Sequence, residues 1–241
     1  MAQSGMFDYL PSIDPTTPQG TIATAKLSQL RPTQNAVGMD EVNYKVAKFE
    51  KKSDAHFEDY LLERPIPVVI GNHDKYYLID HHHLAIAVWR SHGDIVVPVE
   101  VTRNWSPITG FHFWKAMMRE HWLYPFAADG GGPIPVDSMT KHIEDLGNDI
   151  YRSVAWVART HYVYVKSSDN VIFAEFKWAN FFRTHLILIP LLNCKKDCAA
   201  VTLADIREAD PEAHDERLYH ARYLAQSPEA RGLPGFIGPG R

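Results

Sequence analysis

The chain has 241 residues, of which 45% are apolar and 22% charged, values that are ordinary for a globular protein. Its formal net charge of -4 gives no support to a protein that grips a nucleic-acid backbone, although lysines 45, 48, 51 and 52 form a small basic cluster. No apolar run reaches the roughly 18 residues of a membrane span and no signal peptide is recognisable, so we expect a cytoplasmic protein without a membrane partner.

The N-terminal half is predicted to be a small α/β unit. Residues 1–21 are rich in proline and poor in apolar anchors, which favours a flexible arm. An apolar stripe at spacings of three and four predicts a helix over 39–52. Residues 67–71 and 75–79 have the composition of two strands joined by a turn.

Beyond these strands the pattern becomes helical. An apolar helix is expected from Leu84 to near Gly93. Residues 95–101 predict a strand near a sheet edge, because Pro98 cannot donate to a ladder. A helix over 111–123 precedes the stretch Gly130–Pro135, which we interpret as a flexible linker and the main domain boundary.

The second half carries four further helical patterns, at 138–146, 150–159, 174–188 and 212–225. The expected fold class is therefore α+β, a small mixed-sheet unit followed by a mostly helical half. The expected parts are a flexible arm (1–21), an α/β domain with a trailing helix (22–128) and a helical C-terminal domain (136–241).

Two cysteines, Cys194 and Cys198, lie in the second half. Two cysteines alone cannot form a four-ligand zinc site. The pair could form a disulfide or remain two separate thiols, and the low cysteine count suits a reducing compartment.

The run Asp80-His81-His82-His83 stands where a strand passes into a helix N-terminus. Unpaired backbone N–H groups and the positive end of the helix dipole make such a position suited to anions. Histidines there can bind phosphate, bind a metal ion or shuttle protons, and Asp80 can cap the helix or orient an imidazole. A plain helix cap with surface histidines is the alternative.

The stretch from Tyr77 to Leu84 resembles the signature of the ParB/sulfiredoxin fold, a strand followed by Asp-Gly-His-His-Arg or a relative and then a helix. Over roughly residues 27–236 the chain resembles the bacterial family of ParB-like nucleases. The resemblance rests on further segments at 30–34, 41–45, 149–156, 174–179 and 233–236. The chain departs from the signature at His81, where a glycine is usual, and at Leu84, where an arginine is usual.

The resemblance implies a phosphoryl-group site at the signature turn. Relatives on this fold use CTP, ATP or ADP, and in the kinase-type relatives a glutamate of an early helix acts as base. By resemblance Glu41 is the candidate base, with Asp80 and His82 near the phosphates. Loss of the signature arginine removes a bidentate phosphate ligand, and the extra histidine favours a metal-assisted site.

Further candidate ligands flank this turn. Glu41 and Lys45 are four apart and share a helix face, where they could act as base and phosphate ligand or form a surface ion pair. The segment 31–34 supplies Arg31, Thr33 and Gln34 as phosphate ligands, or else only a turn fixed by Pro32.

The three consecutive histidines diverge around the helix start, so two of them at most can meet one ligand. His81 and His83 are the candidate metal ligands, completed by Asp80 or a distant residue. Two aromatic segments, at 111–114 and 176–183, could stack on bases, although their helical spacing favours the core. Arg152 and Glu175 are expected to tie the helical half to the first unit rather than to do chemistry.

Together these patterns predict an enzyme that acts on phosphoryl groups at the turn from Asp80 to His83. The reaction would be nucleotide hydrolysis, phosphoryl transfer or metal-assisted nucleic-acid cleavage, with a divalent metal and ATP, ADP or CTP as candidate cofactors. The alternative is a regulatory module that binds a nucleotide or small anion without turnover.

Overall fold

A computed structural model describes residues 6–166, 171, 173–186 and 200–238. The chain divides into two compact units. The first contains Met1–Asn35, Val42–Ala127 and Gly132–Leu146, and the second Ala36–Glu41, Ala128–Gly131 and Gly147–Arg241. The principal division thus falls after Leu146, whereas we expected it at the Gly130–Pro135 stretch.

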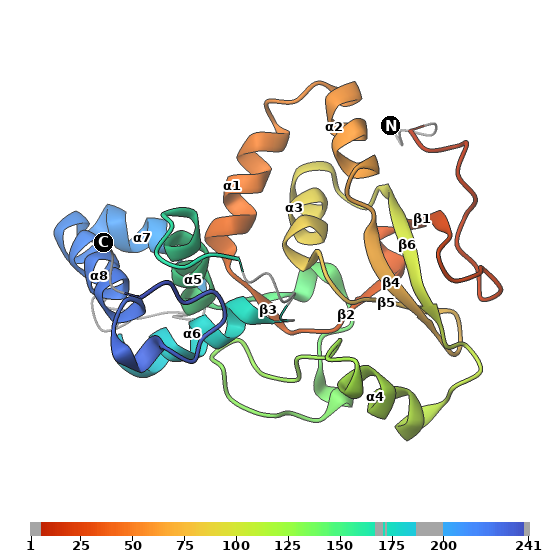
Figure 1. Cartoon of the computed structure of the whole chain (residues 1–241). Helices are drawn as coiled ribbons and strands as arrows, with labels where there is room; N and C mark the ends of the chain where they lie inside the picture. The colour runs from red at the N-terminus through yellow and green to blue at the C-terminus, as the bar shows by residue number, and fades with distance from the viewer. Residues whose placement is uncertain (1–5, 167–170, 172, 187–199, 239–241) are drawn as a thin grey trace. The chain divides into compact units, whose positions relative to one another are not determined.

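The first unit is built on a five-stranded mixed sheet, which confirms the predicted α+β class (Figure 1). Its order is β1-β6-β4-β5-β2, in which β1–β6 and β4–β5 are antiparallel and β6–β4 and β5–β2 are parallel. The strands are β1 (Ile22–Lys26), β2 (Leu30–Pro32), β4 (Ile66–Gly71), β5 (Lys75–Leu78) and β6 (Val96–Asn104).

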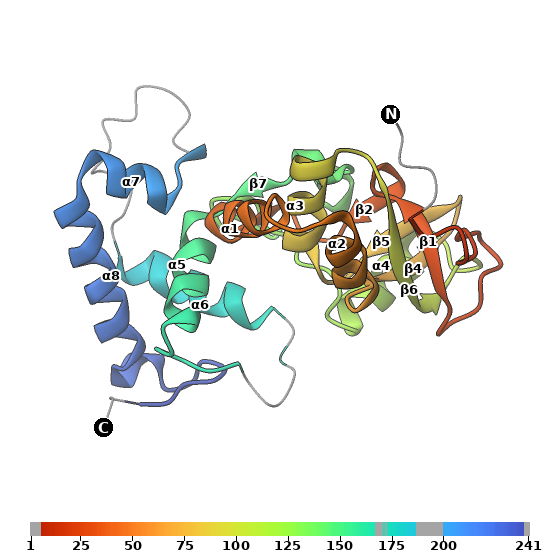
Figure 2. The ribbon, with the colours of Figure 1, turned by 90° about the horizontal axis from the view of Figure 1, so that it is seen from above.

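Helices cover both faces of this sheet. The helices α2 (Asp54–Leu62) and α3 (His82–His92) lie on one face, and α4 (Gly110–Arg119) lies on the other (Figures 1 and 2). On the α4 side, Phe113 and Met117 pack against Val69, Tyr77 and Ile79. A Cβ at Gly71 would come within 2.7 Å of the Tyr77 ring and 3.2 Å of the Phe113 ring, so this glycine leaves room for the two rings.

Residues 95–101 were expected to form a strand near a sheet edge, and β6 lies next to the edge strand β1 but is not itself the edge, because it pairs with both β1 and β4. Pro98 is tolerated for two reasons. The backbone N–H and C=O of its β1 partner Thr24 are hydrogen-bonded to Pro11 and Ile13, not to β6. The pairing of β6 with β4 begins only at Val99.

Residues 138–146 do not form the predicted helix. Two short 3₁₀ turns, η2 (Val136–Ser138) and η3 (Ile143–Asp145), stand there instead. The helix-like spacing reflects three side chains that an irregular chain buries in turn, Met139, Ile143 and Leu146. The backbone N–H of Thr140 donates to Asn35 at 2.9 Å, a bond that fixes the chain outside a helix.

The described part of the N-terminal arm is also ordered by contacts. Ile13 donates to Thr24 and Thr24 donates to Pro11, both at 2.8 Å, so this segment lies along β1. The side chains of Phe7 and Ile13 are buried.

The second unit is mostly helical, with α5 (Ile150–Thr160), α6 (Ala174–His185), α7 (Leu203–Ala209) and α8 (Pro211–Ala225). Its core includes Trp178, Phe182 and Tyr164. A two-stranded parallel sheet joins β3 (Ala36–Val37) to β7 (Gly147–Asn148). The helix α1 (Met39–Phe49) begins in this unit and continues into the first. Cys194 and Cys198, and the last two residues of the predicted helix 174–188, lie outside the described residues.

Candidate functional site

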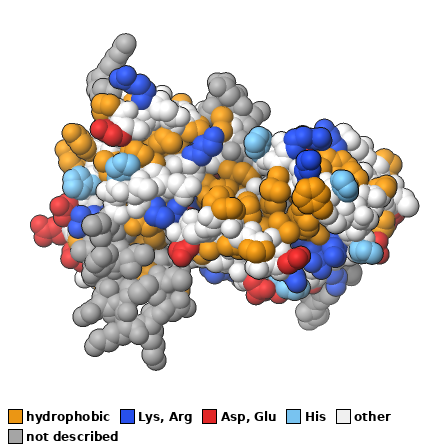
Figure 3. All heavy atoms as spheres, turned by 90° about the horizontal axis from the view of Figure 1, so that it is seen from below, with side chains coloured by type: hydrophobic (Ala, Val, Ile, Leu, Met, Phe, Trp, Pro, Cys, Tyr) orange, Lys and Arg blue, Asp and Glu red, His pale blue; other side chains and the backbone are white. Residues whose placement is uncertain are grey.

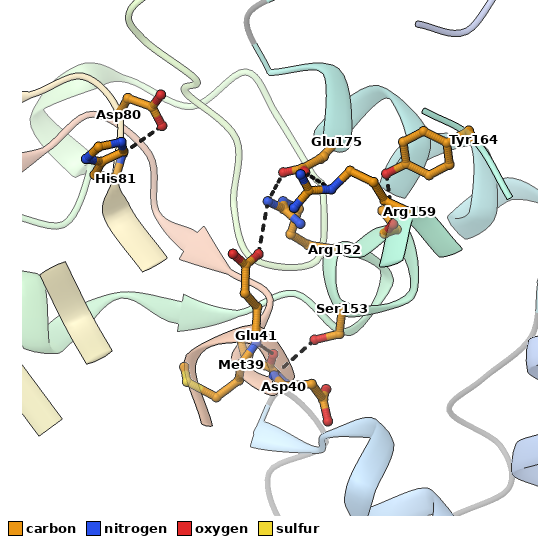
Figure 4. Close-up of polar contacts among 12 residues, drawn as sticks. Met39, Asp40, Glu41, Asp80, His81, Arg152, Ser153, Arg159, Tyr164 and Glu175 are labelled. Carbon is orange, nitrogen blue, oxygen red and sulfur yellow. Dashed lines mark hydrogen bonds and ion pairs between the residues drawn. The ribbon is translucent and has the colours of Figure 1, made fainter. Parts of the chain in front are cut away.

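The turn between β5 and α3 has a left-handed backbone at His81, with φ 63° and ψ 23°. Left-handed backbone costs a residue with a side chain roughly 1–2 kcal/mol, which explains why glycine is usual at this position of the signature. His81 rather than Asp80 is the N-cap residue of α3. Asp80 Oδ1 instead accepts from the His81 backbone N–H at 2.6 Å (Figure 4).

The His81 ring is largely enclosed and lies among cationic groups. Burial lowers the pKa of this imidazole, the Asp80 carboxylate opposes that shift, and the Lys45 ammonium adds to it. A hydrogen bond to the Arg64 backbone raises the pKa and the Arg64 guanidinium lowers it. The ring Nδ1 is buried and has no hydrogen-bond partner among the described residues.

His82 points into the unit and is only 3% exposed. Its Nε2 accepts from the Thr33 backbone N–H at 3.1 Å, while the Thr33 hydroxyl donates to the Leu78 carbonyl at 2.9 Å. Because Nε2 is an acceptor, the ring proton resides on Nδ1. Burial, followed by the neighbouring His83 and His81, lowers the pKa of His82 well below its usual value, so the ring is neutral at pH 7.

The structure therefore brings several of the predicted site residues together within the first unit. Thr33 and His82 are hydrogen-bonded to each other, and the charges of Lys45 and Asp80 shift the pKa of His81. Arg31 is half-buried on β2 and lowers the pKa of Tyr77, against the larger raising effect of burial. Gln34 is buried, and its backbone forms an isolated parallel β-bridge with Tyr124. His83 is half-buried, and Leu84 is buried where the signature has arginine.

Glu41 lies in a buried cluster of charges within the second unit (Figure 4). Its Oε2 lies 3.5 Å from Arg152 Nη2, and the same nitrogen pairs with Glu175. Arg159 Nε completes the cluster at 2.7 Å from Glu175 Oε1. The helices α1, α5 and α6 each supply a member of this cluster, and all of these members belong to the second unit.

Local contacts explain why Glu41 is placed there. Gly38, just before α1, approaches α5 so closely that a Cβ would lie 2.8 Å from the Ser153 nitrogen. The Asp40 N–H donates to Ser153 Oγ at 3.2 Å, and Asp149 Oδ1 caps α5 by accepting from Tyr151 and Arg152.

Sequence reasoning missed two members of this neighbourhood, Arg159 and Tyr164. Arg159 lies seven residues after Arg152, two turns along one face of α5, and this spacing was the available signal. The Tyr164 hydroxyl donates to the Ala155 carbonyl at 2.8 Å, and burial together with Glu175 strongly raises its pKa.

A metal site of three or more protein ligands is not found in the part of the chain that the structure describes. No group of three or more His, Cys, Asp or Glu side chains there could hold an ion. His112 and His121 are exposed on and after α4. Across the described ranges no helix is long and apolar enough to cross a membrane.

A mixed sheet with a strand–histidine–helix turn defines a ParB-like α/β protein with a helical extension. The model of the family described as "Putative ParB-like nuclease" matches residues 23–184, and the chain belongs to this family. The chain is also similar to the crystal structure of protein Atu1540 from Agrobacterium tumefaciens, with 32% identity and a TM-score of 0.73. That match covers 91% of this chain and 98% of the other. A search of curated proteins finds no match.

Proposed function

We propose that this protein binds a phosphoryl group of a nucleotide or a nucleic-acid end at the turn from Asp80 to His83 and acts on it. The observation that carries the proposal is the strained, cation-flanked placement of His81 at the start of α3. Backbone strain in a residue with a side chain persists where the surrounding structure holds it, and such residues cluster at functional sites.

The turn offers several groups that favour an anion. The first N–H groups of a helix have no intrahelical partner, and the helix dipole places partial positive charge there. Lys45 and Arg64 add positive charge close to the His81 ring. With Leu84 in place of the signature arginine, these groups would supply the attraction that a bidentate guanidinium supplies in relatives.

His82 has a positioning role in this proposal. Its bond to Thr33 ties the end of β2 to the start of α3, which fixes the segment that carries Arg31 and Thr33 beside the turn. A neutral, inward-facing ring is suited to holding geometry rather than to contacting phosphate.

The chemistry needs a carboxylate. A water or hydroxyl would attack phosphorus, the leaving oxygen would take the bonding electron pair, and a carboxylate would accept the attacking proton. Asp80 is the exposed carboxylate of the turn. Glu41 is the base that the resemblance implies.

The test is a turnover assay. Release of phosphate from ATP, ADP and CTP, and cleavage of labelled oligonucleotides, are measured with Mg²⁺, with Mn²⁺ and with chelator. We expect one substrate class to react, with a loss of at least about tenfold in His81→Ala, a typical effect of removing one transition-state contact. Asp80→Asn tests the carboxylate of the turn as the base. Equal turnover in wild type and His81→Ala would contradict the proposal.

A regulatory binding module is the second candidate, and the buried Leu84 favours it. Without a bidentate ligand the turn could hold an anion without stabilising a transition state. Nucleotide binding that His81→Ala abolishes, with no turnover of any substrate, would select this alternative.

A further inference from the structure

The outer side of α4 exposes an aromatic ring among basic side chains. Phe111 is 71% exposed and Met118 is 48% exposed. His112, Lys115 and Arg119 are exposed on the same helix, and Lys115 Nζ lies 5.9 Å from the centre of the Phe111 ring. We call these five residues the α4 face. Figure 3, which looks onto the side where α4 lies, shows hydrophobic side chains next to Lys, Arg and His.

This exposure is not needed to anchor the helix. Phe113 and Met117, on the opposite side of α4, are buried against Tyr77 and Val69. At helical spacing Phe111, Lys115 and Met118 form one stripe, and His112, Lys115 and Arg119 form the adjacent one. An aromatic ring and a row of cations therefore face solvent side by side.

The charge of this region is opposite to that of the whole chain. Residues 101–119 contain no aspartate or glutamate, but they include Arg103, Lys115 and Arg119. The next residue, Glu120, lies 3.2 Å from Arg119 and offsets part of its charge. A net charge of -4 thus coexists with a stretch that has no acidic residue and contributes two exposed cations, Lys115 and Arg119.

We propose that the α4 face binds single-stranded nucleic acid. A base stacks on the Phe111 ring, and Lys115 and Arg119 pair with phosphates of the strand. A single strand fits better than a duplex, because only unstacked bases offer their faces to an aromatic side chain. This inference goes beyond the proposed function and does not depend on it, since strand binding requires no reaction at the turn.

The test is a fluorescence-anisotropy titration of labelled oligothymidylate, about 15 nucleotides long, the upper end of common site sizes. Phe111→Ala should weaken binding roughly 5- to 150-fold, as expected for the loss of one stacked base. Lys115→Ala should weaken binding and reduce the salt dependence by about 0.7 in log–log slope. Glu120→Gln should tighten binding, because it frees Arg119.

Two controls separate this surface from general effects. Tyr219 is 72% exposed on α8, so Tyr219→Ala removes an equally exposed ring and should leave affinity unchanged. Nucleotide binding should be unchanged in Phe111→Ala, which distinguishes failure of this inference from failure of the proposed function. The absence of strand binding, equal affinity in Phe111→Ala and wild type, or tighter binding of duplex than of single strand would overturn the proposal.

Discussion

His81 places an imidazole ring on a left-handed backbone position that is suited to glycine, and this conformation costs free energy of folding. His81→Gly and His81→Ala both remove the ring, and they differ in the cost of the left-handed backbone. His81→Gly should have an unfolding free energy about 1 kcal/mol higher than His81→Ala, since glycine adopts the left-handed region without strain. Chemical denaturation measures the difference.

The neighbouring His83 is the matched control for this pair. It lies in the first turn of α3, where the backbone is right-handed and glycine is less favourable than alanine. The order should therefore reverse, with His83→Ala more stable than His83→Gly. The same order at both positions would contradict the left-handed assignment of His81.

His82 makes stability depend on pH. Its pKa is well below 6.5 in the folded protein because burial disfavours the charged ring. As pH falls below about 6.5, the unfolded chain takes up a proton that the folded protein does not, so the unfolding free energy decreases by up to about 1.4 kcal/mol per pH unit. No such loss occurs above that pH.

Denaturation of wild type and His82→Gln between about pH 8 and pH 5 measures this effect. The variant should show a shallower decline than wild type below about pH 6.5. A residual slope is expected from His81 and His92, whose pKa values burial also lowers. Parallel curves would show that His82 does not titrate as its burial implies.

At the scale of elements, the strand–turn–helix segment was predictable because local sequence determines it. The strands β4 and β5 are almost continuously buried apolar runs on either side of a short turn, and α3 has an apolar stretch from Leu84 to Trp89 before its C-cap at Gly93. The interior position of β6 was not predictable, because it depends on a register in which Pro98 meets no required bond. The helix α2 went unpredicted, since its apolar residues form only a weak stripe.

The buried charge cluster of α5 gives a prediction at this scale. Arg152→Met removes the cation that Glu41 and Glu175 share and leaves two carboxylates without it in a buried place. Removing one partner of a buried ion pair typically costs about 3–5 kcal/mol of unfolding free energy. Arg159→Met, which removes a more exposed member, should cost less.

A combined variant checks that charge rather than packing is responsible. Adding Glu41→Gln and Glu175→Gln to Arg152→Met should restore part of the lost unfolding free energy, measured by denaturation. If the triple variant were no more stable than the single one, the cost would come from the lost side-chain volume.

The candidate site was only partly predictable for the same reason. Asp80, His81 and Thr33 lie in segments whose residue types and order are informative on their own. The inward orientation of His82 and its bond to Thr33 depend on how β2 and α3 pack, which the spacing of residues does not encode. The ion pair between Glu41 and Arg152 depends on the close approach of Gly38 to Ser153. These two residues are more than 100 positions apart in the sequence.

At the scale of the whole molecule, average composition conceals local differences. A net charge of -4 argued against a nucleic-acid partner, yet an acid-free stretch over 101–119 carries the exposed ring and cations of the α4 face. The helical half likewise holds its own buried core and ion-pair cluster. Predictions about partners are therefore better made from each surface than from the sum of charges.

The central claim is that the turn from Asp80 to His83 binds phosphoryl groups, and isothermal titration of ATP, ADP and CTP tests it most directly. His73 is the matched control, since it too has positive φ, at 56°, but is exposed in the hairpin between β4 and β5. We expect at least one nucleotide to bind wild type and His73→Ala equally and His81→Ala at least about tenfold more weakly, the loss of one good polar contact. Equal binding by all three proteins, or binding by none, would contradict the account.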